Sequence, residues 1–251
     1  MPPTSTRRIY TTPALPYDVI WEIIDKTWNS PLSTHERIFF MAASQLVNRT
    51  WAKIFTHIAH KDAHIPSSAY LQHYLRTLRL GFFFHGEPSG DIPSLLCRSI
   101  TIDSQKGIRK ILPDLLYKLK ITGALPNLRT LSIVYTESSF DDIFDCYQFI
   151  DFPSGVENME LYFSTGDRRH RFDDDRSLLV YPPWYMPFLR RLSIVGGNEW
   201  LIKDYLLACP RLTVLETDFY LRDFPFPSSP GSPPTTKLEC RRIPCLNNFL
   251  L

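Results

Sequence analysis

The chain has 251 residues, enough for one large domain or for a small module joined to a larger one, and its 44% apolar content is sufficient for a core. Its 28 Lys and Arg nearly balance its 26 Asp and Glu, which excludes the strong field expected of a protein that binds nucleic acid or an anionic membrane. The 21 prolines against 10 glycines argue against glycine-built phosphate loops.

The sequence contains no candidate for a membrane span or an export signal. Residues 1–13 include two arginines but no apolar run behind them, and no window reaches the roughly 18 apolar residues that a membrane helix needs. The 5 cysteines are scattered and odd in number, as expected where thiols stay reduced. We therefore expect a soluble protein of the cytoplasm or nucleus.

Two helical stretches are predicted near the N-terminus. Apolar residues recur at helical spacing between residues 15 and 28, and Pro16 suits the first helical position because it has no N–H to leave unpaired there. A break follows, and Ser33 with Glu36 forms a capping box that begins a second stretch. Its apolar stripe continues to residue 58 with a bend near Asn48.

These helices carry a recognisable motif. A Leu-Pro start, an acidic residue two positions on, an aliphatic helix and a closing Val-Asn-Arg-Thr-Trp element at residues 47–51 resemble the F-box, the helical module that binds the Skp adaptor of cullin-RING ubiquitin ligases. The resemblance implies a Skp-type adaptor as partner. The residues that match motif positions for the fold or the adaptor contact are Leu15, Pro16, Val19, Ile20, Val47 and Trp51. The alternative is an ordinary helical cap on the domain that follows.

The remaining chain contains a repeat. The pattern apolar-x-x-apolar-x-apolar occurs at residues 75–80, 97–102, 128–133, 156–161, 189–194 and 212–217. The intervals between copies range from 22 to 33 residues, close to the leucine-rich-repeat period of roughly 20–29. Each copy ends in an alternating stretch that predicts a short strand, and several copies follow a proline.

Helical patterns at residues 107–119, 140–150 and 198–208 lie between the copies. Such strand–helix units cannot bury their apolar sides alone, so they are expected to stack into an irregular solenoid with a parallel sheet. The whole resembles F-box/leucine-rich-repeat proteins and is similar to fungal F-box-like proteins. The predicted class is α/β, with a flexible N-terminus (1–12), an F-box-like helical module (13–62), a leucine-rich-repeat-like solenoid (63–222) and a Pro/Ser-rich tail (223–251).

Signatures of catalysis, metal binding and cofactor binding are absent from the sequence, so no enzyme, metal or cofactor is predicted. His57, His60 and His64 fall near one helical face, but they lack a fourth ligand, and a solvated helix end is the better interpretation. The charged run 166–176 alternates in sign and is predicted to be a solvated loop; a hydrolase that uses His170 and residues 173–175 is the alternative.

Aromatic residues recur after the predicted strands, at Phe83, Tyr135, Tyr162 and Phe219. At the rim of a solenoid they form a target-binding surface, since aromatic side chains give large contact area at low entropy cost; the alternative places them in the core. The resulting hypothesis is a non-catalytic adaptor of a Skp-cullin-F-box ubiquitin ligase that holds a target protein through its repeats. The alternative is a repeat scaffold without a ligase, capped by the helices.

Overall fold

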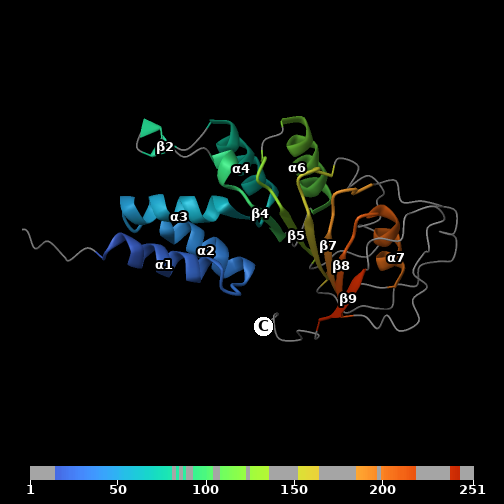
Figure 1. Cartoon of the computed structure of the whole chain (residues 1–251). Helices are drawn as coiled ribbons and strands as arrows, with labels where there is room; N and C mark the ends of the chain where they lie inside the picture. Colours follow the sequence, from blue (N-terminus) through green and yellow to red (C-terminus); the bar gives the residue numbers. More distant parts are fainter. Residues whose placement is uncertain are drawn as a thin grey trace, which may run out of the picture. The chain divides into compact units, whose positions relative to one another are not determined.

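The computed structural model (Figure 1) describes residues 15–80, 83–84, 87–88, 93–103, 108–122, 125–135, 152–163, 185–196, 199–218 and 238–243. The chain divides into two compact units, Met1–Ile58 and Ala59–Leu251, and the division falls inside one helix. None of the helices in these described ranges combines the length and the apolar character needed to cross a membrane.

Three helices form the first unit: α1 (Tyr17–Trp28), α2 (Thr34–Ser44) and α3 (Arg49–Lys61), of which α3 continues into the second unit. The predicted capping box is confirmed, because Ser33 Oγ accepts from the backbone N–H of Glu36 while the Glu36 carboxylate accepts from that of Ser33. Asn48 Oδ1 accepts from the Trp51 N–H at 2.9 Å and so caps α3, which explains the predicted bend. Pro16 precedes the first helical residue instead of occupying that position.

The core of the first unit is an aromatic cluster. The Trp28 and Phe40 rings each lie edge-on to Phe55, with centroids 5.5 and 5.6 Å away. The Arg37 guanidinium lies over the Trp28 ring at 4.8 Å and donates to the Trp28 carbonyl at 2.6 Å. Arg37 on α2 therefore satisfies a carbonyl at the C-terminal end of α1 and fixes the two helices together.

The second unit contains a seven-stranded sheet in which all neighbouring strands are parallel. Its strands, in spatial order, are β1 (Asp62–Ile65), β4 (Ser99–Asp103), β5 (Thr130–Tyr135), β6 (Asn158–Phe163), β7 (Arg191–Val195), β8 (Val214–Thr217) and β9 (Glu239–Arg242). This order is also their order along the chain. The strands β2 (Phe83–Phe84) and β3 (Glu87–Pro88) form a separate antiparallel pair.

Helices cover one face of this sheet. They are α4 (Ser68–Leu80), α6 (Ile108–Thr122) and α7 (Glu199–Ala208), and a short helix α5 (Pro93–Leu96) precedes β4 (Figure 1). Alternate strand residues, such as Leu131 and Ile133, point toward the helices and join one continuous hydrophobic core with helical residues such as Leu71 and Leu116. The predicted α/β class with a parallel sheet is thus correct.

A recurring turn leads into four of the strands. The amide N–H groups of Leu128, Val156, Leu189 and Leu212 each donate to the carbonyl three residues earlier, at 3.1–3.3 Å. Three of these turns have proline at their second position, where its fixed φ suits a tight turn. The prediction that a proline precedes the strand is therefore confirmed for these three copies, and the same turn recurs along the chain.

The prediction of a strand in the first repeat copy, residues 75–80, is wrong. Residues 75–80 lie in α4, not in a strand, although their sequence is similar to that of the copies that form β5 and β7. Leu71, Leu75 and Leu78 recur at helical spacing, and Ser67 Oγ accepts from the Tyr70 N–H at the start of this helix. The helical context before the copy therefore overrides the strand-like pattern within it.

Two strands of the seven-stranded sheet, β1 and β9, were not predicted. The strand β1 begins directly after α3, so His64 lies on a strand and does not share a helical face with His57 and His60. The strand β9 lies inside the segment predicted as a tail, and all four of its residues are exposed. Exposed alternation of this kind has no apolar side from which to recognise a strand.

We predict that the two faces of a strand differ in their effect on stability. Leu131→Ala and Leu192→Ala remove fully buried side chains and should each lower the free energy of unfolding by about 2–5 kcal/mol. Ser193→Ala, on the other face of β7, should lower it by about 1 kcal/mol or less. Urea unfolding measures all three variants, and equal losses for Leu192 and Ser193 would show that the strand faces are misassigned.

Candidate functional site

The face of the sheet opposite the helices is polar. Alternation along each strand, with every strand in register, arranges its side chains in rows that cross the sheet. The first row is Asp62, Ser99, Thr130, Asn158, Arg191, Val214 and Glu239. The second row is His64, Thr101, Ser132, Glu160, Ser193, Glu216 and Arg241. The third row includes Asp103, Val134, Tyr162 and Val195. We call these three rows the polar face.

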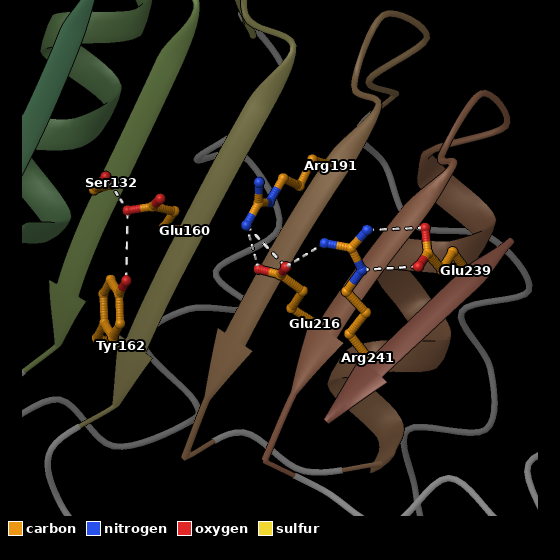
Figure 2. A network of polar contacts seen from close by, with 7 residues as sticks. All are labelled: Ser132, Glu160, Tyr162, Arg191, Glu216, Glu239 and Arg241. Carbon is orange, nitrogen blue, oxygen red and sulfur yellow. Dashed lines mark hydrogen bonds and ion pairs between the residues drawn. The ribbon is translucent and has the colours of Figure 1, made fainter. Parts of the chain in front are cut away.

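Ion pairs connect the last three strands of the polar face (Figure 2). Arg191 Nη2 on β7 donates to both carboxylate oxygens of Glu216 on β8, each at 2.8 Å. Glu216 is nearly buried, and its Oε1 also lies 3.9 Å from Arg241 Nη1 on β9. Arg241 in turn donates to both oxygens of Glu239, and this pairing lowers the pKa of Glu239. Charges of alternating sign therefore neutralise one another across β7, β8 and β9.

A different arrangement surrounds Glu160 on β6. Its Oε2 accepts from Ser132 Oγ on β5 at 2.8 Å and from the Tyr162 hydroxyl at 3.5 Å (Figure 2). Burial raises the pKa of Tyr162 to about 12, and the negative charge and hydrogen bond of Glu160 act in the same direction. Neither partner of Glu160 is a cation, so its charge is not neutralised as that of Glu216 is.

Within the described residues, the polar face does not place a histidine base beside Ser132. A serine nucleophile needs a base within about 2.6–3.2 Å. His64, the histidine of the second row, stands two strands from Ser132, a separation of roughly 10 Å, and lies 4.0 Å from Asp103. No group of three or more potential metal ligands occurs within the described residues. His170 and residues 173–175, the hydrolase alternative, lie outside them.

The first unit presents a second candidate surface, which is apolar. Its described residues include eight large apolar side chains that are exposed: Leu15, Tyr17, Val19, Ile23, Ile38, Phe39, Leu46 and Val47. Leu46 is 85% exposed and Phe39 is 70% exposed. Single exposed apolar residues are normal on a monomer, but eight on a three-helix unit make this unit a candidate for association.

The residues predicted to bind an adaptor fall into two groups. Leu15, Pro16, Val19 and Val47 are exposed and therefore accessible to a partner. Ile20 is buried in the helical core, so it supports the module and does not form a contact surface. Trp51 is half-buried, and its ring packs at the start of α3.

The predicted target-binding aromatics are not equivalent. Tyr135 is only 1% exposed and stacks on Phe163 at 4.9 Å, so it is a core residue and not part of a recognition surface. Side chains alternate between the two faces of a strand, so Tyr135 lies on the same buried face of β5 as Leu131 and Ile133. Tyr162 lies on the other face of the sheet, the polar face, and the residue is 36% exposed. The Phe83 side chain and all of Phe219 lie outside the described residues.

The charged residues of the polar face were not predicted as a site, although the sequence contains a signal for them. In the five repeat copies that form strands, the second row corresponds to the single variable position between the last two pattern residues, as in Leu131-Ser132-Ile133 and Met159-Glu160-Leu161. An alignment of the copies on their apolar residues therefore identifies the residues of this row. Arg241 has no such signal, because β9 carries no apolar pattern.

Comparisons with protein-family models, with curated proteins and with solved structures found no match to this chain.

The raised pKa of Tyr162 gives a test of the polar face. We expect Tyr162 to ionise near pH 12, and Glu160→Gln to lower this pKa while burial keeps it above the ordinary value of 10.0. Because the folded state retains a proton that the unfolded chain has lost, Tyr162 makes the free energy of unfolding fall as pH rises from about 10 to 12. Ultraviolet titration of the protein against Tyr162→Phe isolates this group. An unchanged pKa in Glu160→Gln contradicts the described geometry.

Proposed function

We propose that this chain is a non-catalytic substrate-recognition adaptor of a Skp-cullin-F-box type ubiquitin ligase. The first unit serves as an F-box and binds a Skp-type adaptor protein, while the second unit is a leucine-rich-repeat-like solenoid that binds a target protein. The chain brings the target close to the ligase, and other subunits transfer ubiquitin. Proximity converts a bimolecular encounter into an effectively intramolecular one, which is the chemical contribution of such a protein.

The exposed apolar side chains of the first unit carry this proposal. Four of the six residues matched to the F-box motif are exposed, although each is apolar. A helix that served only its own core would direct such residues inward, as α1 does with Ile24 and Trp28. An apolar surface of this kind is stabilised when a partner covers it, since removing apolar area from water contributes roughly 25 cal/mol per Å².

Three features of the second unit support the repeat assignment. Strands consecutive in the chain are neighbours in one parallel sheet, apart from the small β2–β3 pair. The same turn precedes four strands. Backbone bonds also connect neighbouring turns, since the Arg129 N–H donates to the Arg98 carbonyl and the Arg190 N–H donates to the Glu157 carbonyl. Stacked units that contact only their neighbours are the defining property of solenoids.

The polar face is the proposed target-binding surface. It displays two half-exposed arginines, Arg191 and Arg241, together with the exposed part of Tyr162. Arginine and tyrosine are enriched at binding hot spots, because both combine large contact area with directional polar groups. The opposite face of the sheet is occupied by the hydrophobic core.

We predict that Leu15→Ala combined with Val47→Ala reduces affinity for a Skp-type adaptor at least thirtyfold, since the loss of even one interface anchor costs about 2 kcal/mol or more. Both side chains are exposed in the chain alone, so the variant should keep its unfolding midpoint. Co-purification with a Skp-type adaptor, followed by titration calorimetry, measures the effect.

The matched control is Leu95→Ala, which removes a leucine of similar exposure from α5 in the second unit. It should bind the adaptor like the native chain. Equal binding by the double variant and the native chain, or no complex with the native chain, would favour a repeat scaffold whose helices have no connection with a ligase.

A further inference from the structure

We propose that Glu160 is the specificity residue of the polar face and that it binds a lysine side chain of the target protein. This inference rests on the proposed function, because it names the chemistry that the target-binding surface selects. Its basis is the contrast between Glu160 and the other glutamates of the same face.

Glu160 differs from Glu216 and Glu239 in the partners that its carboxylate has. Both oxygens of Glu216 accept from Arg191 Nη2, and Glu239 receives a bidentate pair from Nε and Nη2 of Arg241. Glu160 is half-buried, yet it accepts only from two neutral hydroxyl groups, and both of these bonds go to Oε2. A partly desolvated carboxylate is stabilised most by a charged donor, so Glu160 has an open capacity for one cation.

The residues in register with Glu160 carry no charge that could neutralise it. Ser132 on β5 and Ser193 on β7 stand in register on either side of Glu160, and both are among the smallest polar residues. The arginines of the polar face are directed elsewhere: Arg191 bonds to Glu216 and Arg241 bonds to Glu239. The ligand itself must therefore supply the charge.

An apolar strip next to Glu160 fits the stem of a long side chain. The third row places Val134, Tyr162 and Val195 side by side in register on β5, β6 and β7. All three are partly exposed, and the row lies roughly 7 Å along the strands from Glu160. A lysine whose methylene stem lies on this strip places its ammonium at the carboxylate, as amphipathic side chains do when they bury their stems.

The geometry favours lysine over arginine. Oε2 of Glu160 already accepts two hydrogen bonds, which leaves Oε1 for the ligand. A guanidinium achieves its advantage by donating to both oxygens of a carboxylate, whereas an ammonium acts as a point charge and needs only one. Glu160 also disfavours an acidic ligand, because two like charges in a partly desolvated site repel each other.

The test is selection from a random nine-residue peptide library displayed on phage, with the full chain as bait. We expect lysine to be enriched at one position above its frequency in the input library. A fluorescent version of the selected peptide should bind about tenfold or more weakly when this lysine is acetylated, because acetylation removes the charge and keeps the stem. Replacement of the lysine by arginine should also weaken binding.

Two matched variants locate the effect. Glu160→Gln retains an oxygen that accepts from Ser132 and Tyr162, and it should remove both the lysine enrichment and the sensitivity to acetylation. Glu157→Gln makes the same change of charge three residues earlier, outside the β6 strand, and should leave both intact. The proposal is overturned by three results: no lysine enrichment, an equal affinity of the acetylated peptide, or equal losses in the two variants.

Adaptor binding is measured on the same preparations, so that the two proposals can fail separately. A chain that binds the Skp-type adaptor but shows no dependence on Glu160 overturns the lysine inference alone. A chain that selects lysine through Glu160 but does not bind the adaptor overturns the ligase assignment alone. Unfolding midpoints of the two variants, expected to match that of the native chain, verify that neither result reflects loss of the fold.

Discussion

The register between neighbouring parallel strands determines which side chains the second unit buries and which it presents. Each strand pairs with the next so that Ile100, Leu131, Met159, Leu192 and Leu215 form one buried row. The residue after each of these belongs to the second row of the polar face. A shift of one residue in any pairing would exchange the two sets, placing charges in the core and leucines in water. The core, the ion pairs and the proposed lysine site all depend on this single constraint.

The first unit obeys a different constraint, because three short helices enclose little volume. Trp28, Phe40 and Phe55 fill the interior with large rings, and Arg37 closes one end of it. This cluster uses only one side of each helix. Apolar residues on the remaining sides stay in contact with water, which explains why Ile23 on α1 is exposed while Ile24 is fully buried. A unit of this size has too little interior to cover them and is stabilised further when it associates.

Much of the fold could be predicted from the sequence, because local signals agreed with tertiary packing. The Ser33–Glu36 box, the proline turns and the apolar spacing of five repeat copies all led to the observed elements. Prediction failed where the local pattern allowed two structures, as in residues 75–80, or where no apolar pattern existed, as in β9. The candidate site was harder to predict. Alternation along β5 is enough to assign Tyr135 to the core, because it lies on the same strand face as Leu131 and Ile133. The pairing of Arg191 with Glu216 depends on β7 and β8 being neighbours, which the sequence of one strand does not reveal.

The separation of the two faces lets binding chemistry change without altering the fold. Residues of the buried row must be apolar and of suitable volume, since the core is closely packed. Those of the second row are not part of that core, and serine, threonine, glutamate and arginine all occur there. In this row Glu216 is neutralised by arginines of the same face, and it therefore serves the sheet. Glu160 stands between two serines, because neither neighbouring strand places a cation at that position, and its carboxylate is the group that we propose binds a lysine of the target.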